Sequence, residues 1–386
     1  MPSELDPRSR AERAPLLDIA GSRALPSWAY TDPDLWRAEF PAIFFRHWHY
    51  VCHDSALAEP GDYVTTAIHD QELFLTRGHD GGIRAFYNVC AHRGHVLVEG
   101  RGSKNRLVCP YHAWTYDLTG RLIGAPGSGK TEGFVRSDIC LSDVRVDQML
   151  GFVFVNLDPD APPLAEYVGD LPEVMRAAVP GLEDMRPQQG TDYFGQDIAC
   201  NWKVLVDNFL ECYHCEPAHP SFSDLLDVPG TTHAFGANYT QQHVPGACKA
   251  ENAAYPLDLE HDFIDGTFWL LYPNTIMGYL PGDPNFFISR VDPHAPERCR
   301  RHADQMVLLG ADSQRDEQRR QWARDYVVAE DIALCEAVQR GMRSKGFAQG
   351  HYIINPDDEN FTEECVRFFH RRYADEMGDA LSVPAD

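Results

Sequence analysis

Short runs of alternating apolar and polar residues occupy the first half of the chain, and this alternation is typical of half-buried β-strands. Runs of this kind cover residues 63–68, 72–76 and 152–156. Glycine and aspartate clusters, notably 78–82, separate them. Short strands with frequent turns indicate a compact antiparallel domain. We therefore predict a small all-β domain over residues 45–158.

A different pattern begins after the proline-rich stretch 158–164, which we interpret as a linker because proline disrupts helix interiors and central strands. Large apolar residues recur at helical spacing between 201 and 214, and a highly charged helical pattern covers 314–340, before Gly341 as a helix stop. Three strand-like segments lie between these helices: 268–272, 275–280 and 286–291. The pattern predicts an α+β domain over residues 159–386, on which the N-terminal segment, residues 1–44, packs.

The composition of the 386-residue chain is that of a globular protein, with 44% hydrophobic and 11% aromatic residues. The formal net charge of −24 argues against a nucleic-acid partner, because phosphate binding requires a basic surface. The N-terminus is charged and polar, unlike a signal peptide, and no segment approaches the run of about 20 apolar residues that spans a bilayer. We therefore expect a cytoplasmic protein with no membrane partner.

Eleven cysteines are present, an odd number in a chain much longer than a small disulfide-stabilised scaffold. This pattern favours a reducing compartment, in which some cysteines coordinate metal and most other thiols are free. Cys212 and Cys215 are expected to be among the free, packed thiols.

Two short motifs combine one cysteine with one histidine: Cys90 with His92 and, after sixteen intervening residues, Cys109 with His112. Two cysteines and two histidines can hold zinc, but zinc motifs usually group cysteine with cysteine and histidine with histidine. The mixed pairs suit a [2Fe–2S] cluster in which the cysteines bind one iron and the histidines bind the other. The spacing therefore predicts such a cluster, with zinc as the alternative.

The residues around these motifs, C-A-H-R-G-H-V-L and C-P-Y-H-A-W-T-Y-D-L-x-G, resemble the two cluster-binding loops of Rieske domains in bacterial aromatic-ring and betaine oxygenases. His95 lies inside the first loop but does not match a ligand position. We expect it to be a loop or packing histidine.

A second metal site is predicted where Glu211 and His214 stand three residues apart, a spacing that places them on one face of a helix. His219 would turn away on a continuing helix. Pro217, however, biases the residue before it out of the helical conformation, so the chain can bend and return His219 to the same ion. Two histidines and one carboxylate form the facial triad of non-haem Fe(II) oxygenases.

The third ligand of this site is either Glu330 or Asp331, which are adjacent on the predicted late helix and are not separated by the residues themselves. The resemblance to Rieske oxygenases extends from about Phe40 to Gly341. It favours Asp331, which matches the position of the third ligand. It also implies a helix-grip (Bet v1-like) catalytic domain and a cyclic homotrimer.

In such a trimer, the cluster of one subunit lies close to the iron of the next. The resemblance places His112 opposite a carboxylate that also touches the iron ligand His214, and Glu211 matches this bridging position. A carboxylate suits the role because it accepts hydrogen bonds from both imidazole N–H groups and fixes their tautomers.

The substrate class is predicted from this bridging position, which is typically Asp in ring-hydroxylating dioxygenases but is Glu211 here. The string D-N-F-L-E-C-Y-H-C-E-P-A-H-P-S-F looks more like the oxygenases that act on glycine betaine, choline, carnitine and stachydrine. Aromatic faces bind a trimethylammonium group favourably, and candidates for such a cage are Phe268, Trp269, Tyr272 and Tyr279. Strand alternation puts Phe268 and Tyr272 on one face and Trp269 on the other, and an ordinary sheet core is the alternative for each.

The resemblance therefore implies an oxygenase component whose cofactors are a [2Fe–2S] cluster and mononuclear Fe(II), with O2 as co-substrate. A flavin- or ferredoxin-type reductase would supply electrons from NAD(P)H. Hydroxylation of a C–H bond beside nitrogen would release an aldehyde such as formaldehyde and the demethylated amine. The alternatives are a Rieske oxygenase that acts on an aromatic or other small organic acid, and a non-catalytic Rieske electron carrier.

Overall fold

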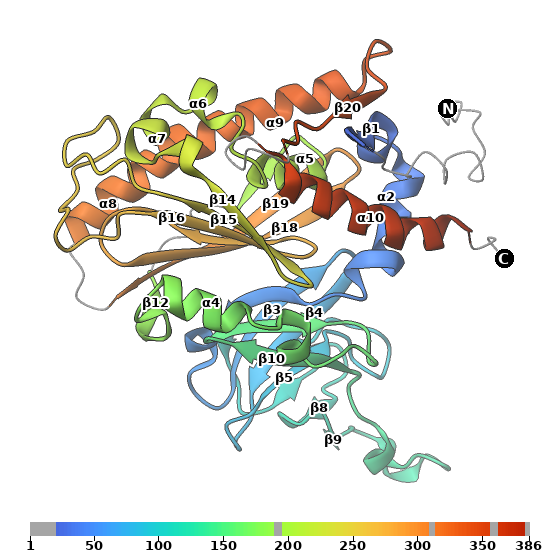
Figure 1. Cartoon of the computed structure of the whole chain (residues 1–386). Helices are drawn as coiled ribbons and strands as arrows, with labels where there is room; N and C mark the ends of the chain where they lie inside the picture. Colours follow the sequence, from blue (N-terminus) through green and yellow to red (C-terminus); the bar gives the residue numbers. More distant parts are fainter. Residues whose placement is uncertain (1–20, 189–194, 309–312, 356–361, 383–386) are drawn as a thin grey trace. The chain divides into compact units, whose positions relative to one another are not determined.

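The computed structural model describes residues 21–188, 195–308, 313–355 and 362–382. The chain divides into two compact units: residues 45–167 make up one, and residues 1–44 and 168–386 belong to the other (Figure 1). Within the described ranges, no helix combines the length and the apolar character that a membrane span requires.

The unit of residues 45–167 is built from antiparallel strands, as its sequence pattern predicts. One sheet has the strand order β2-β11-β10-β5-β4-β3-β6, and a smaller sheet has the order β7-β8-β9. The strands are β2 (His49–His53), β3 (Asp62–Ile68), β4 (Gln71–Arg77), β5 (Ile83–Tyr87), β6 (Arg101–Ser103), β7 (Leu107–Val108), β8 (Thr115–Tyr116), β9 (Leu122–Gly124), β10 (Asp143–Met149) and β11 (Phe152–Asn156). Every residue of β11 is buried, so this strand is covered on both faces.

The first unit extends beyond the predicted boundary at residue 158. Helix α3 (Leu164–Val168) follows the proline-rich stretch, and the Tyr167 hydroxyl lies 2.9 Å from Nδ1 of His47. Nε1 of Trp48 donates to the Pro162 carbonyl at 3.1 Å. These bonds attach the stretch to the start of the same unit, which therefore continues to Tyr167.

The second unit contains a larger antiparallel sheet of order β12-β19-β18-β17-β16-β15-β14, with β13 also paired to β19. Its strands are β12 (Met185–Pro187), β13 (Gln196–Ile198), β14 (Thr232–Phe235), β15 (Tyr239–Val244), β16 (Gly266–Leu271), β17 (Thr275–Tyr279), β18 (Asn285–Ala295) and β19 (Arg298–Leu308). The helices of this unit are α2 (Pro33–Glu39), α4 (Leu171–Ala178), α5 (Trp202–Phe209), α6 (Cys215–Ala218), α7 (Pro220–Leu225), α8 (Ser313–Trp322), α9 (Ala329–Met342) and α10 (Glu364–Ser382).

Helices cover the sheet of the second unit. Figure 1 shows α6, α7, α8 and α9 on one side of it, and α5 lies against β18, β19 and α9. Two segments that are far apart in the sequence also meet in this unit, because β1 (Arg23–Pro26) pairs with β20 (Gln349–His351). The predicted α+β class, in which helices pack over an antiparallel sheet, is confirmed.

Helix α2 of the N-terminal segment is attached to the second unit through a buried carboxylate. Glu39 is 0% exposed and forms an ion pair with the equally buried Lys203 of α5. Glu39 also accepts hydrogen bonds from Nε1 of Trp202 at 2.8 Å and from the Tyr373 hydroxyl, on α10, at 2.7 Å. A buried carboxylate needs such partners, because desolvating an unpaired charge is costly.

Two predicted helices differ in the structure. Helix α5 ends at Phe209, so Glu211 and His214 lie in the turn after it rather than on a helix face. The long charged helix is interrupted by a π-helical segment, η9 (Ala323–Val328), between α8 and α9. It also runs through Gly341 to Met342, because Gly341 does not adopt the positive φ with which a glycine ends a helix.

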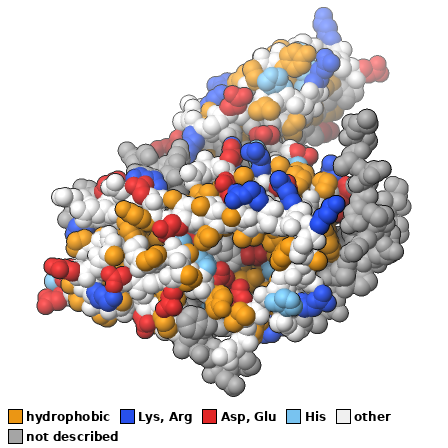
Figure 2. Space-filling view, turned by 90° about the horizontal axis from the view of Figure 1, so that it is seen from above, with side chains coloured by type: hydrophobic (Ala, Val, Ile, Leu, Met, Phe, Trp, Pro, Cys, Tyr) orange, Lys and Arg blue, Asp and Glu red, His pale blue; other side chains and the backbone are white. Residues whose placement is uncertain are grey.

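The face of the molecule shown in Figure 2 mixes acidic, basic and apolar side chains. Acidic and apolar groups border the basic ones on this face.

Candidate metal sites

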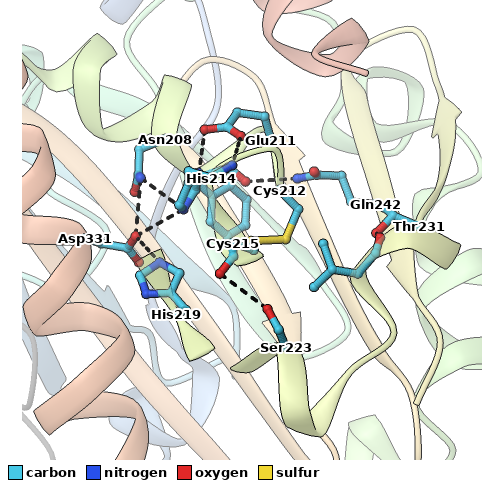
Figure 3. Close-up of a disulfide and its surroundings, with 12 residues drawn as sticks. Asn208, Glu211, Cys212, His214, Cys215, His219, Ser223, Thr231, Gln242 and Asp331 are labelled. Carbon is cyan, nitrogen blue, oxygen red and sulfur yellow. Dashed lines mark hydrogen bonds and ion pairs between the residues drawn. A yellow bond between two sulfur atoms is a disulfide. The ribbon is translucent and has the colours of Figure 1, made fainter. Parts of the chain in front are cut away.

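Three side chains converge on one point of the second unit: His214, His219 and Asp331. One ligand atom from each lies within 4.8 Å of the others, and Figure 3 shows the three side chains turned toward one another. Oδ1 of Asp331 lies 2.9 Å from Nε2 of His219 and 3.4 Å from Nε2 of His214. Two imidazoles and one carboxylate are the donor set of a facial triad, which suits Fe(II).

The chain between the two histidines bends, although not where the sequence indicated. Glu216 is helical within α6, because Pro217 lies in the first turn, where its missing N–H is tolerated. The helix ends instead at His219, whose φ of −125° and ψ of 70° are not helical, and α7 begins at the proline behind it. A residue that precedes proline is biased against helix. This break between α6 and α7 places the His219 side chain close to that of His214.

The two neighbouring acidic residues on α9 contact opposite sides of one imidazole. Asp331 meets Nε2 of His219, whereas Glu330 lies 2.7 Å from its Nδ1 atom. Asp331 also approaches His214, and Glu330 does not belong to the group of converging donors. The two candidates therefore differ in position, since Asp331 belongs to the group of converging donors and Glu330 lies behind the histidine.

Glu211 lies behind the other histidine. Its Oε1 atom is 2.5 Å from Nδ1 of His214, and its Oε2 atom accepts from the His214 backbone N–H at 3.1 Å. The carboxylate thus fixes both the ring and the main chain of the turn. With Nδ1 engaged in this way, Nε2 is the nitrogen that is left to bind a metal.

Asn208, at the end of α5, is a residue of this site that the sequence pattern did not identify. Its Nδ2 atom donates to Oδ1 of Asp331 at 3.2 Å, and Figure 3 shows it beside the triad. This bond orients the carboxylate. Asparagine in a helix carries no spacing signal of its own, and only the packing of α5 against α9 brings the two side chains together.

The electrostatics of the site favour positive charge between these carboxylates. Burial opposes protonation of His214, but its hydrogen bonds with Asp331 and Glu211 outweigh this effect and raise its pKa to about 10. The pKa of His219 is raised for the same reason, since Asp331 and Glu330 outweigh burial. Burial works against the Asp331 carboxylate, yet the two histidines lower its pKa to about 2. A metal cation can replace these protons.

Cys212 and Cys215 form a disulfide, which corrects the expectation of two free thiols. The bond closes the turn that carries His214, and Figure 3 shows it directly beside that residue. The expectation failed because it inferred thiol state from the odd cysteine total, whereas pairing depends on two Cβ atoms being brought together. Here the turn between α5 and α6 does so.

A cavity of about 150 Å³ adjoins the triad and contains both polar and aromatic groups. Four phenylalanines line it: Phe209, Phe222, Phe268 and Phe287. Phe268 lies at their centre, with its ring centroid 6.2, 6.3 and 6.4 Å from those of Phe209, Phe222 and Phe287. Arg301 also lines this cavity, on the sheet side.

Of the four aromatic residues predicted to bind substrate, the structure brings only Phe268 to the lining of this cavity. Nε1 of Trp269 donates to Gln241, and Tyr279 lies beside Thr267, on the opposite face of the sheet. Tyr272 does not share a strand face with Phe268 as predicted, because β16 ends at Leu271. The Tyr272 hydroxyl donates to Glu376 of α10 at 3.0 Å.

The four predicted cluster ligands of the first unit lie at two loops of matching geometry. In each loop the cysteine N–H donates to the carbonyl five residues later, from Cys90 to His95 and from Cys109 to Trp114. Each cysteine carbonyl accepts from the residue four positions on, and that residue, Gly94 or Ala113, has positive φ. The His95 carbonyl therefore stabilises the first loop by accepting from Cys90, in agreement with the predicted loop position of this histidine.

The donor atoms of these loops fit a two-metal cluster better than a single ion. Both cysteines are 2% exposed, the rings of His92 and His112 lie 4.6 Å apart, and Nδ1 of His112 is buried with no hydrogen-bond partner in the described part of the chain. Two cysteines and two histidines on paired loops are the donor set of a [2Fe–2S] cluster in which the cysteines bind one iron and the histidines bind the other.

Comparison with known proteins gives matches over both units. Residues 182–379 match the model for the ring hydroxylating alpha subunit (catalytic domain), and residues 47–137 match the Rieske [2Fe-2S] domain. The carnitine monooxygenase oxygenase subunit of Escherichia coli (strain K12) is 34% identical over 92% of this chain and 94% of its own. The glycine betaine monooxygenase oxygenase subunit of Chromohalobacter salexigens is 30% identical over 86% and 82%.

A solved structure is also similar along nearly the whole chain. It is that of a quaternary ammonium Rieske monooxygenase, studied for carnitine oxidation by gut microbiota and for inter-subunit electron transfer. The two structures superpose with a TM-score of 0.84 and 31% sequence identity, covering 94% of this chain and 97% of the other.

Proposed function

Because this chain belongs to the Rieske non-haem iron oxygenases, as a ring-hydroxylating-type alpha subunit, we propose that it oxidises a quaternary ammonium compound at a carbon bound to nitrogen. Membership makes the protein an oxidoreductase that uses a [2Fe–2S] cluster, mononuclear iron, O2 and electrons from a reductase. The substrate class, the site residues, the NAD(P)H source and the assembly are the proposed parts.

Seven residues hold the metals in this proposal. Cys90 and Cys109 bind one iron of the cluster, and His92 and His112 bind the other. His214, His219 and Asp331 bind the mononuclear iron, for which their converging donors are suited. When bound, this iron activates O2 with electrons supplied through the cluster.

Three further side chains position the ligands. Glu211 holds Nδ1 of His214, Glu330 holds Nδ1 of His219, and Asn208 holds Oδ1 of Asp331. Partners of this kind fix the tautomer and the direction of each ligand, and they increase the basicity of imidazole.

Glu211 has a second role if the protein forms a homotrimer. In that assembly the carboxylate also accepts a hydrogen bond from His112 of the partner subunit, so that it joins the cluster of one protomer to the iron site of the next. Inter-subunit electron transfer in a structurally similar quaternary ammonium monooxygenase supports this arrangement.

The observation that carries the substrate proposal is the aromatic wall beside the triad. Three phenylalanines surround Phe268 in the cavity that the candidate ligands adjoin. A quaternary ammonium group cannot accept or donate hydrogen bonds, and the faces of aromatic rings attract it. The names of the relatives, which act on carnitine and glycine betaine, point to the same class.

The reaction inserts one oxygen atom of O2 into a C–H bond next to nitrogen, and the other leaves as water after two electrons and two protons are taken up. The resulting N–CH(OH) group collapses because the C–N bond breaks as the hydroxyl proton is lost. The products are an aldehyde and an amine with one substituent fewer.

Turnover of methylated ammonium compounds tests this proposal. The purified protein, loaded with iron and supplied with a flavin reductase and NADH, is incubated with carnitine, glycine betaine, choline and benzoate. Oxygen-dependent aldehyde formation from at least one ammonium compound, with none from protein in which Asp331→Asn removes a ligand, is expected. Hydroxylation of benzoate alone would contradict the proposed substrate class.

A further inference from the structure

A row of residues that crosses five strands forms the floor of the cavity beside the triad. Gln242 pairs with Phe268, Phe268 with Gly278, Gly278 with Phe287, and Phe287 with Gln305. All except Gly278 line the cavity. A Cβ atom on Gly278 would lie 2.8 Å from Phe268 and 3.0 Å from Phe287, so glycine lets the two rings approach each other. The row therefore has two aromatic rings in its middle and one glutamine at each end.

The two glutamines differ in their hydrogen bonds. Nε2 of Gln242 donates to the Phe209 carbonyl at 2.9 Å, so this amide holds the end of α5. Gln305 is 6% exposed, and its side-chain amide has no hydrogen-bond partner among the residues that the structure describes. A buried polar group without a partner is unfavourable, and native proteins leave few of them. Because Gln305 lines the cavity, a bound ligand can supply the missing partner.

Gln305 lies at the end of the aromatic wall that is away from the triad. Ring contacts lead from the triad along this wall: the centroids of His219 and Phe222 are 6.4 Å apart, those of Phe222 and Phe268 are 6.3 Å apart, and those of Phe268 and Phe287 are 6.4 Å apart. Gln305 comes next, since it pairs with Phe287 on the neighbouring strand. A ligand that packs on the two central rings can therefore reach the triad at one end and this amide at the other.

The three arginines that line the cavity are engaged within the protein. Arg319 and Arg320 share the buried carboxylate of Asp316, and Nε of Arg301 donates to Oγ of Ser289 at 3.1 Å. A charged group of a ligand would have to compete with these partners. An uncharged group can be bound by the glutamine at the far end of the row, and no contact within the protein is lost.

We propose that Gln305 is a specificity-determining residue whose amide binds an uncharged hydrogen-bonding group, such as a hydroxyl, at the end of the substrate remote from the oxidised carbon. This inference rests on the proposed function. A hydroxyl suits an amide because it can donate to Oε1 and accept from Nε2. With that end held, the ammonium group packs on Phe268 and Phe287, and a carbon bound to nitrogen is directed toward the triad. The distance between the two groups of the substrate then decides how well it binds.

A series of matched compounds tests the role of Gln305. Each is a trimethylammonium compound with a chain of two to five carbons that ends in a hydroxyl group, and its partner has a methyl group in place of the hydroxyl. Dissociation constants are measured anaerobically by calorimetry on the iron-loaded protein, and kcat/KM is measured with a flavin reductase and NADH. The variants are Gln305→Leu, Gln305→Asn and, as control, Gln196→Leu, an exposed change on β13.

At the best chain length, the wild-type protein is expected to bind the hydroxyl compound about 3- to 10-fold more tightly than its methyl partner, as for one uncharged hydrogen bond. Gln305→Leu should remove this preference and change binding of the methyl compound less than about threefold. Gln305→Asn withdraws the amide by one methylene group, so the best chain should become one carbon longer, a shift that a general loss of packing would not produce. Gln196→Leu should change neither constant. Iron content and circular dichroism show that each variant is folded.

The contrary results are distinguishable. Equal binding of hydroxyl and methyl compounds by the wild-type protein at every chain length overturns the inference, even if no variant folds, while turnover of these compounds supports the proposed function. A preference for the hydroxyl that persists in folded Gln305→Leu also overturns it. If none of the ammonium compounds is oxidised and only an aromatic acid is, the proposed function and the inference both fail.

Discussion

Glu330 contacts Nδ1 of His219 at 2.7 Å, on the side of the imidazole opposite the one that faces Asp331. Two consecutive carboxylates of α9 thus serve one histidine in different ways. Asp331 converges with His214 and His219, and Glu330 contacts the other side of the His219 ring. This arrangement predicts losses of iron binding of different size for two conservative variants.

Asp331→Asn should abolish binding of the mononuclear iron, whereas Glu330→Gln should only weaken it by about 10- to 100-fold, as is typical when the partner of a ligand is lost. Asp331→Asn removes a charged donor, and Glu330→Gln removes only the support of His219. Iron analysis of each purified variant measures the difference, with the absorbance of the cluster as internal control. Equal iron loss in both variants would show that Glu330 is itself a ligand.

Binding of iron should become tighter as pH rises. In the metal-free protein the pKa of His214 is raised to about 10 by Asp331 and Glu211, against the effect of burial. The imidazole is therefore protonated at neutral pH, and the metal must displace the proton. Below pH 10, apparent affinity should increase about tenfold per pH unit for each proton released. Anaerobic calorimetry from pH 6.5 to 8.5 in two buffers measures the dissociation constant of iron and the number of protons released. A dissociation constant that does not change with pH would show that iron displaces no proton from His214.

Glu211→Gln should slow electron transfer between the two metals even when the variant is fully loaded with iron, although the change also removes some of the support of His214. The amide keeps the shape of the side chain but cannot accept from two imidazole N–H groups with the strength of a carboxylate. We expect turnover to fall by about 10- to 100-fold. Single-turnover oxidation of the chemically reduced cluster measures the step directly. Glu216→Gln, an exposed change on α6, is the control. Unchanged coupled turnover in Glu211→Gln would exclude the bridging role.

Phe268→Leu should weaken binding of a quaternary ammonium compound by about 2- to 30-fold, the range of a single cation–π contact. Phe268 is the central ring of the cavity wall, and leucine keeps the apolar character without the aromatic face. Trp269→Phe, on the opposite face of β16, is the matched control and should change binding less than twofold. Calorimetry with tetramethylammonium isolates the contact from any carboxylate. Similar effects of both changes would indicate a packing role for Phe268.

Glu39→Ala should destabilise the second unit by about 3–5 kcal/mol, because it leaves Lys203 buried without its counter-ion. The change also removes the acceptor of Trp202 and Tyr373. Urea unfolding followed by circular dichroism measures the loss. Glu183→Ala breaks the exposed pair with Arg176 and should reduce the free energy of unfolding much less. A similar small loss for Glu39→Ala would mean that the N-terminal segment contributes little.

The proximity of the candidate metal ligands was predictable where their pattern is local. The two cysteine–histidine motifs lie on tight loops, so sequence spacing translates directly into spatial proximity. His214 and His219 are likewise five residues apart. The backbone conformation between these two histidines was predicted less well, since the bend occurs at His219 rather than before Pro217. Several backbone conformations can bring two nearby side chains together. The sequence therefore predicts that the side chains are close more reliably than it predicts the backbone conformation between them.

The sequence by itself determined the two-unit organisation in outline, the α+β class and the identity of the residue types that could hold iron, since these depend on periodicity and short-range spacing. Tertiary structure alone distinguished the position of Asp331 from that of Glu330 and determined which aromatic residues line the cavity. Those choices depend on which elements pack together: α9 against α5, and β16 beside β18 across Gly278. Contacts between distant segments form when whole faces of helices and sheets become buried against each other. A local sequence pattern does not show which side chains will be in contact across such an interface.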